Sequence, residues 1–320
     1  MAKHIEILMN YLEYERLWSS QEISTLMKLI RISPDLKSLF QFMSEKEKSV
    51  TKITKYGDAG KEDVVFVVPS ADVHNSTSLK LREQIGEHPL IFVESSGPGF
   101  NYSHSCNAGI TAALDEGFKW IILCNDDLIF KQKVDSLLEF VESSVEDSVL
   151  TPKNGVKEDK RYHGEEFSIF RSNALLLGLT VYNSRWSFDN NKISWPYVSS
   201  YLKNFQFFLR NMKYVIGVNN TAQTFEKISR RITNNIVNFA DFGIFPAGIL
   251  RKYQFDETYW NGSEDYDFAL RLHKDKIPIR KIDFQVESIG SASLGRSGRK
   301  HIITLLNSLY FSYKTASIIA

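Results

Sequence analysis

Apolar residues between positions 64 and 152 form short continuous runs that alternate with stretches of helical spacing. The continuous runs have the length of strands that are buried on both faces, and they occupy 64–68, 90–93, 120–124 and 148–152. Between them, apolar residues recur every three or four positions, as along one face of a helix, at 79–85, 110–117 and 134–141. This alternation predicts a parallel α/β sheet covered by helices on both faces, with Gly117 ending one of the helices.

The first 60 residues have a different pattern. Ser19 and Glu22 have the spacing of a capping box, and apolar residues continue after them on one helix face. Ser33 followed by Pro34 is typical of a second helix start. We therefore expect a helical hairpin, which either packs on the main domain or docks a partner. The charged stretch 44–63 that follows is predicted to be a linker.

Length and composition fit this organisation. With 320 residues, 43% of them hydrophobic, the chain can bury a sizeable core. We divide it into an N-terminal helical module at 1–60 and an α/β domain at 61–320, with a nucleotide-binding half at 61–152 and an acceptor-binding half at 153–320. The net charge of +1 excludes a general nucleic-acid binder. Two cysteines form no disulfide framework, and the start lacks a signal-peptide core, so a cytoplasmic protein is expected.

Three polar residues, Asn125, Asp126 and Asp127, directly follow the apolar run at 120–124. Adjacent carboxylates repel each other, and burying an isolated carboxylate is costly, so either solvent or a cation has to cover them. Open α/β sheets bind ligands at the carboxyl ends of their strands, where these residues are expected. The position indicates a metal or phosphate role. The structural alternative is that Asp127 caps the next turn.

A second acidic group opens a predicted helix further along the chain. Ser263 stands at the capping position, and Glu264, Asp265 and Asp267 fall in the first turn, where the helix dipole favours negative charge. Asp267 and Arg271 have the spacing of an ion pair. A well-capped surface helix is the preferred interpretation for Asp267.

Three segments together resemble the family 2-like glycosyltransferases of the GT-A fold. The segment GFNYSHSCNAGITAALDEGFKWIILCNDDLIF, at 99–130, is similar to the family's stretch from a Gly-Phe and an Asn-x-Gly helix into its Asp-x-Asp-type metal motif. The segment GILRKYQFDETYWNGSEDYDFALRL, at 248–272, resembles the acceptor-side stretch in which Glu-Asp opens a helix. The segment at 287–314 resembles the C-terminal stretch, with its late Asn and Tyr-Phe…Lys. The resemblance covers about residues 63–314, and it rests on order and spacing.

The resemblance implies a mostly parallel GT-A-type sheet and an inverting transfer of a sugar, hexosyltransferase-like, from a UDP-, GDP- or dTDP-sugar. The acceptor would be a hydroxyl group of a glycan or of a lipid-linked molecule. Mg²⁺ or Mn²⁺ would be held by Asp127 with Asp126 beside it. The catalytic residues would be Asp265, as the general base, and its neighbour Glu264. The acceptor side would include Trp260, Ser263 and Glu264. The nucleotide sugar would lie along Pro69, Ser70, Glu94, Asn107, Asn125 and Asp126.

The sequence also departs from the family pattern. Cys106 stands where many relatives have arginine, and Ser288 stands where many have a histidine that can join the metal site. Two other classes stay open. A sugar-phosphate nucleotidyltransferase usually has a Gly-rich basic loop after the first strand, where this chain reads PSADVHNS. A non-catalytic sugar-binding or partner-binding protein could keep the same fold.

The stretch 185–240 is treated as an insertion between the two halves of the site. It contains eight basic residues against two acidic ones and is rich in aromatic residues. We expect it to shape the acceptor site, either as an ordinary helix covering the sheet or as a basic amphipathic helix on an anionic membrane surface. The second interpretation implies peripheral contact with the cytoplasmic face of the membrane.

Overall fold

The computed structural model describes residues 11–19, 28–29, 33, 36–58, 62–153, 155–158, 161–163, 166–167, 236–237, 239, 241–289, 303, 306–307, 310–311 and 314. Most of the predicted insertion at 185–240 lies outside these residues, and so does most of the helix predicted after Ser19. The membrane contact proposed for the insertion therefore stays a prediction. In the described part of the chain, no helix has the length and apolar character needed to cross a membrane.

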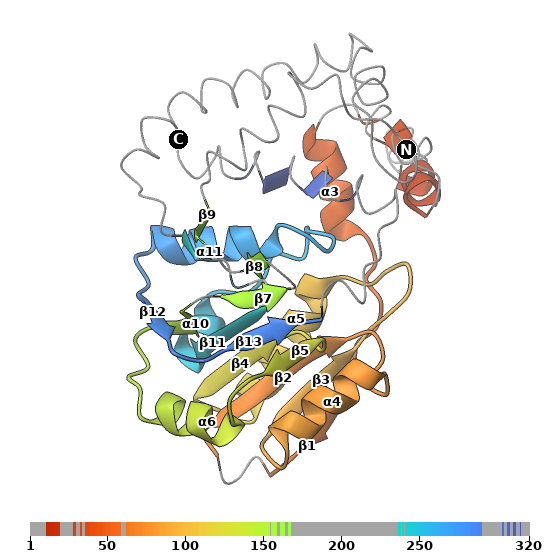
Figure 1. The fold of residues 1–320 in the computed structure, drawn as a ribbon. Coiled ribbons are helices and arrows are strands. Elements are labelled where there is room, and N and C mark those ends of the chain that lie inside the picture. The colour runs from red at the N-terminus through yellow and green to blue at the C-terminus, as the bar shows by residue number, and fades with distance from the viewer. Residues whose placement is uncertain are drawn as a thin grey trace.

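A mixed sheet of seven strands forms the centre of the molecule, in the order β1-β3-β2-β4-β11-β6-β12 (Figure 1). The strands are β1 (Lys52–Tyr56), β2 (Val64–Ser70), β3 (Leu90–Glu94), β4 (Trp120–Cys124), β6 (Val149–Pro152), β11 (Phe242–Pro246) and β12 (Ile279–Ile282). Strands β3, β2 and β4 are mutually parallel, and so are β6 and β12. Strand β11 runs antiparallel between β4 and β6, and β1 runs antiparallel to β3. The predicted α/β class is confirmed, with two antiparallel strands that were not foreseen.

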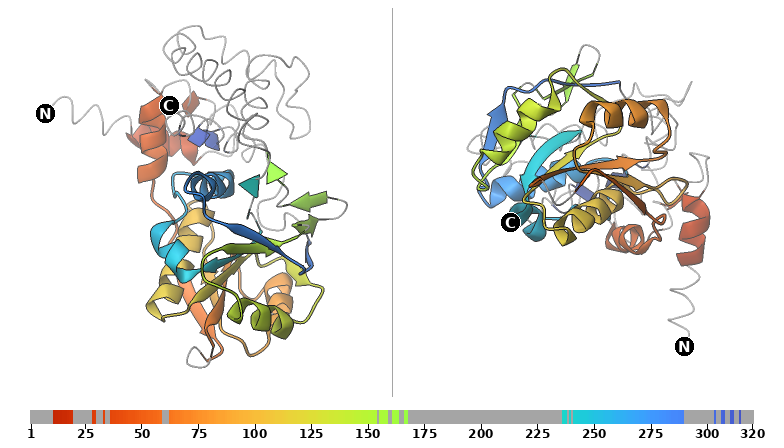
Figure 2. Two further views of the ribbon diagram at one scale, coloured as in Figure 1. Left: turned by 90° about the vertical axis from the view of Figure 1, so that its left-hand side faces the viewer. Right: turned by 90° about the horizontal axis from the view of Figure 1, so that it is seen from below.

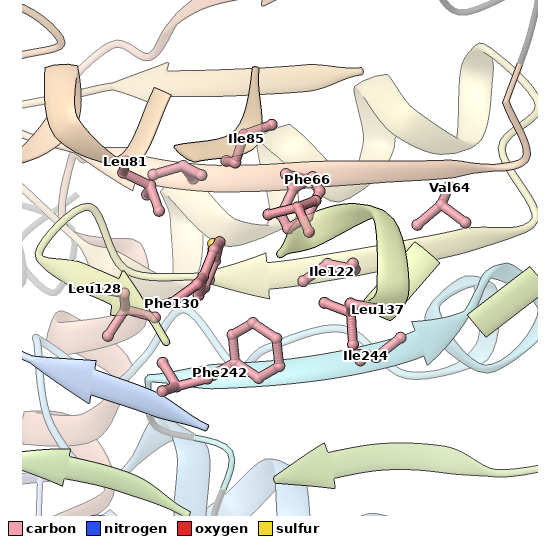
Figure 3. Packing of buried hydrophobic residues seen from close by; sticks show 14 of the residues in the cluster. Val64, Phe66, Leu81, Ile85, Ile122, Leu128, Phe130, Leu137, Phe242 and Ile244 are labelled. Carbon is pink, nitrogen blue, oxygen red and sulfur yellow. The ribbon is translucent and has the colours of Figure 1, made fainter. Parts of the chain in front are cut away.

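Helices cover both faces of this sheet (Figure 2). The helices are α4 (Ser76–Ile85), α5 (Tyr102–Asp115), α6 (Val134–Glu142), α10 (Ala247–Lys252) and α11 (Glu264–Lys274). One core contains Val65 and Val67 together with residues of α5, α10 and α11. The other core contains Val64 and Phe66 together with residues of α4 and α6 (Figure 3). Alternate side chains of a strand point to opposite faces, so a strand buried on both faces reads as a continuous apolar run.

A smaller sheet of four strands lies beside the second core, in the order β5-β13-β7-β8. Its strands are β5 (Leu128–Phe130), β13 (Val286–Ser288), β7 (Val156–Glu158) and β8 (Arg161–His163). Strand β13 pairs antiparallel with β5, with Ser288 opposite Leu128. This pairing brings position 288 next to the chain that leaves Asp127. Two further short strands, β9 (Glu166–Phe167) and β10 (Ile236–Val237), pair antiparallel with each other.

The stretch predicted to be a charged linker contains β1, so this prediction is wrong. Ile53 lies opposite Val93, and the strand forms the outer edge of the sheet. Lysines at 52 and 55 are a usual way to protect such an edge, and they conceal the strand in a composition-based prediction. The hydroxyl of Ser33 donates to the Leu29 carbonyl oxygen of the preceding turn. The predicted cap of the next helix by Ser33 stays a prediction, because residues 34 and 35 lie outside the described residues.

The N-terminal module packs on the α/β domain, which is one of the two predicted interpretations. Residues 11–18 are helical, and they are followed by α3 (Leu36–Glu45). The ring of Trp18 lies 5.2 Å from that of Trp260, edge to face, and the Trp260 indole N–H donates to the Met43 carbonyl oxygen at 2.9 Å. Figure 1 shows α11 between the sheet and α3. The module therefore covers the loop that leads into α11.

Candidate functional site

Asp126 is held by hydroxyl and amide groups that come from the end of β2 and the start of α4. Its Oδ2 accepts hydrogen bonds from the hydroxyls of Ser70 at 2.6 Å and Ser78 at 3.1 Å, and from the Asn75 amide at 3.3 Å. The Asn75 side chain also caps α4 by accepting from Thr77 and Ser78 N–H groups. These contacts compensate for the burial of Asp126, which is only 9% exposed. Asp126 thus ties the end of β4 to the end of β2.

Asp127 faces the second sheet. It is 8% exposed, and its Oδ2 accepts a hydrogen bond from the Ser288 hydroxyl at 3.2 Å. The Asp127 carbonyl oxygen also accepts from the Ile289 N–H at 3.0 Å. The pairing of β13 with β5 makes this approach possible. The structure therefore brings position 288 to Asp127, where the resemblance places an additional metal ligand in many relatives.

Asn125 is fixed from two sides. Its Oδ1 accepts from the Tyr102 hydroxyl at 2.8 Å, and its Nδ2 donates to the Asp241 carboxylate at 2.8 Å. Its N–H donates to the Asp241 carbonyl oxygen at 3.0 Å. Asp241 directly precedes β11, and Phe242 pairs with Cys124, so the antiparallel strand starts where β4 ends. The sequence prediction missed Asp241. The only available signal was an aspartate directly before an apolar run.

Three predicted nucleotide-binding residues lie at the same edge of the sheet. Pro69 and Ser70 end β2, and Glu94 ends β3, with Ser70 opposite Glu94 in the parallel register. The Ser95 N–H donates to the Ser70 carbonyl oxygen at 3.0 Å. Lys52 lies 3.4 Å from the Glu94 carboxylate, but this exposed pair contributes little stability. The structure thus brings these three residues to the same edge of the sheet as Asn125, Asp126 and Asp127.

The side chain of Asn107, predicted to contact the nucleotide, bonds the segment before α11. Its Nδ2 donates to the Phe255 carbonyl oxygen at 2.9 Å and to the Glu257 carboxylate at 3.0 Å, and its Oδ1 accepts from the Phe255 N–H at 2.9 Å. The side chain therefore joins α5 to the segment before α11. These contacts define a structural role, and the predicted contact with a nucleotide stays a prediction.

Glu264 and Asp265 form the first turn of α11, and both are largely buried, at 6% and 9% exposed. The Glu264 carboxylate accepts the Gly262 N–H at 2.5 Å. Burial and the neighbouring Asp265 raise the pKa of Glu264 to about 8. Ser263 has the N-cap position with φ 71°, but its side chain makes no capping hydrogen bond to the described first turn, so the predicted side-chain cap is wrong. Trp260 is 2% exposed beneath the N-terminal module, which leaves little of its ring to contact an acceptor.

The C-terminal residues hold the segment that carries these carboxylates. Asn307 bonds both the N–H and the carbonyl oxygen of Trp260, each at 2.9 Å. Lys314 donates to Asp256 at 2.6 Å and to the Asp267 Oδ2 at 3.0 Å. Burial opposes ionisation of Asp256, but Lys314 and the hydrogen bonds from Thr258 together more than compensate and lower the pKa of Asp256.

Asp267 belongs to the same charge network. The predicted pair of Asp267 with Arg271 is confirmed at 2.9 Å. The expected surface position of Asp267 is wrong, because its side chain is 1% exposed. Two cations, Arg271 and Lys314, allow this burial by compensating the negative charge.

Tyr102 joins the two segments that carry the acidic residues, the one at 125–127 and the loop that leads into α11. Its N–H donates to the Asn261 Oδ1 at 2.8 Å, and its hydroxyl donates to Asn125. Burial raises the pKa of Tyr102 well above its ordinary value, so the hydroxyl keeps its proton and can donate. The loop at Asn261 and Ser263 has positive φ values of 57° and 71°, a strained conformation that leads directly into Glu264. The start of α11 is thereby fixed next to the carboxyl end of β4.

The fold and the site define an α/β protein with acidic side chains gathered where β4 ends and β11 begins. Among the residues that the structure describes, no group of three or more His, Cys, Asp or Glu side chains is arranged to hold a metal ion. A scan against protein-family models found no match for this chain, and a search of curated proteins found no similar sequence.

Proposed function

We propose that the protein is a metal-dependent inverting glycosyltransferase that moves a sugar from a nucleotide-sugar donor to a hydroxyl group of a glycan or a lipid-linked acceptor. One observation carries this proposal. Tyr102 donates hydrogen bonds to Asn125, which directly precedes Asp126 and Asp127, and to Asn261, which lies in the loop leading into Glu264 and Asp265. Two acidic groups from distant segments thus converge on one edge of the sheet, as transfer between a donor and an acceptor requires.

Asp127 is the residue that would hold the cation. The Oδ2 of Asp126 already accepts from three side chains, so this residue orients the loop and can offer mainly its other oxygen. Carboxylate oxygens suit Mg²⁺ and Mn²⁺, and the diphosphate and water would provide further ligands. When bound, the cation neutralises the negative charge that develops on the departing diphosphate.

Asp265 is the residue that would accept the proton of the attacking hydroxyl. Because the raised pKa of Glu264 keeps that carboxyl protonated at neutral pH, the pair retains one negative charge, which we assign to Asp265. A positioned carboxylate base typically accelerates such a step by roughly 10² to 10⁴. Direct attack with one base inverts the anomeric centre and needs no covalent intermediate.

The first test is cation-dependent binding of nucleoside diphosphates. UDP, GDP and dTDP are titrated into the protein by calorimetry with Mn²⁺, with Mg²⁺ and with EDTA. We expect one of them to bind only with a cation, and Asp127→Asn to lose this binding while staying folded, because the substitution relieves repulsion with Asp126. Asp63→Asn is the matched control. Asp63 is an exposed aspartate at the amino end of β2, and the candidate site lies at the carboxyl end of this strand. Undiminished binding by Asp127→Asn would show that the metal assignment is wrong.

A further inference from the structure

The polar groups of the site follow the order of the strands in the sheet. Glu94 ends β3, Ser70 ends β2, Asn125 and its two neighbours follow β4, and Asp241 precedes β11. These strands are consecutive neighbours. Neighbouring strands lie about 4.8 Å apart, so Glu94 and Asp241 are separated by three spacings, or about 14 Å. This span is comparable with the length of an extended nucleoside diphosphate sugar.

A nucleotide sugar is linear, with the base at one end, the diphosphate in the middle and the sugar at the other end. If the base lies at Glu94 and the diphosphate at Asp127, the sugar reaches the next strand along the sheet, which is β11. We propose that Asp241 binds a hydroxyl group of the donor sugar and thereby helps to determine which sugar is accepted. This inference rests on the proposed function and assigns to it a residue that the family resemblance did not mark.

The environment of Asp241 suits such a contact. The residue is half-buried, and one carboxylate oxygen accepts from the Asn125 amide at 2.8 Å. Its carbonyl oxygen accepts from the Asn125 N–H, and the next residue, Phe242, is buried in the core at 2% exposed. The side chain is therefore fixed at both its backbone and its head group. A carboxylate has about four lone-pair positions, so Asp241 can hold Asn125 and accept from a sugar hydroxyl at the same time.

Such a residue discriminates between sugars. A fixed carboxylate accepts from a hydroxyl in one orientation, and an epimer that lacks this hydroxyl leaves the carboxylate oxygen without that hydrogen bond. The alternative is that Asp241 acts only by orienting Asn125, which Tyr102 holds from the other side. Two substitutions separate these roles. Asp241→Asn keeps an oxygen that accepts from Asn125 but removes the charge, whereas Asp241→Ala removes both.

The experiment compares two affinities by calorimetry in the presence of Mn²⁺. One is the affinity for the nucleoside diphosphate that the wild type binds, and the other is the affinity for hexoses linked to that diphosphate which differ at one hydroxyl. We expect Asp241→Asn, which keeps an oxygen that accepts from Asn125, to bind the diphosphate within about 3-fold of wild type. The affinity for the best nucleotide sugar should fall by about 10- to 100-fold, the usual loss for a hydrogen bond to a charged group. Asp63→Asn should behave as wild type in both titrations.

Other outcomes would overturn the inference. An Asp241→Asn variant with wild-type affinity for the nucleotide sugar would limit Asp241 to orienting Asn125. A parallel loss of diphosphate and nucleotide-sugar binding would lead to the same conclusion, provided that urea denaturation shows a folded variant. If the wild type binds no nucleoside diphosphate with Mn²⁺, the proposed function itself fails. These results are distinguishable, because only the last one involves the unaltered protein.

Discussion

Replacing Asn107 by alanine tests whether this residue is structural. Its amide makes hydrogen bonds with the N–H and the carbonyl oxygen of Phe255 and with the Glu257 carboxylate. Asn107 is 8% exposed and Phe255 is 5% exposed, so water cannot readily replace the lost partner. The substitution therefore leaves two backbone groups of residue 255 buried without their hydrogen bonds.

The expected loss follows from these three contacts. A hydrogen bond contributes about 1 kcal/mol net, and an unsatisfied buried group costs about 1–3 kcal/mol, so Asn107→Ala should lower the free energy of unfolding by about 3 kcal/mol. Urea denaturation followed by tryptophan fluorescence measures this change. Thr111→Ala, on the exposed side of the same helix, is the matched control and should change stability by about 0.5 kcal/mol or less.

The same variant separates the structural role from the predicted nucleotide contact. If the amide only joins α5 to the 255–257 segment, the folded variant should bind the nucleoside diphosphate within about 3-fold of wild type. A loss of stability below about 1 kcal/mol would refute the reasoning from these contacts. A normal stability combined with a large loss of diphosphate affinity would restore the role that the sequence resemblance implies.

Three further predictions concern pH and the metal. The folded state raises the pKa of Glu264 from 4.5 to about 8, so its carboxyl costs stability as pH rises through that interval. The free energy of unfolding of Glu264→Gln in urea denaturation should therefore exceed that of wild type by up to about 5 kcal/mol at pH 8.5 and equal it at pH 4. Burial lowers the pKa of His88, but Glu62 and Asp135 together raise it above 6.5. This stabilisation is complete below pH 6.5 and is lost at higher pH, so His88→Gln should lower the free energy of unfolding at pH 6 and change it little at pH 9. Ser288→His should tighten Mn²⁺ binding about 10-fold in calorimetry, and an unchanged affinity would argue against a metal site at Asp127.

The parallel strands and their helices could be predicted because each leaves a strong local pattern. Strands β2, β3 and β4 are buried on both faces, so their sequences are continuous apolar runs. Gly117 has φ +85° just after α5, as its predicted capping role requires. The edge strand β1 was missed because its lysines resemble a solvated linker. Strands of two or three residues, such as β5 and β13, are too short to give a periodic pattern.

The candidate site was predictable only where neighbours in sequence are also neighbours in space. The group at 125–127 could be assigned to the ligand-binding edge because it follows a recognisable strand. Asp241 could not, because its place depends on β11 running antiparallel to β4, and no local feature encodes that direction. The roles of Asn107 and Asn261 likewise depend on partners that are distant in sequence: Phe255 lies 148 residues from Asn107, and Tyr102 lies 159 residues from Asn261.

Release of a nucleoside diphosphate from a nucleotide sugar tests the proposed function most directly. The protein is incubated with Mn²⁺ and with UDP-, GDP- or dTDP-hexoses in turn, and the products are separated by ion-exchange chromatography. We predict slow hydrolysis of one donor to the free diphosphate, with activity lost in Asp127→Asn. In Asp265→Asn, turnover should fall by roughly 10² or more while donor binding is kept. Formation of pyrophosphate from a nucleoside triphosphate and a sugar phosphate, or undiminished turnover by a folded Asp265→Asn variant, would contradict the account.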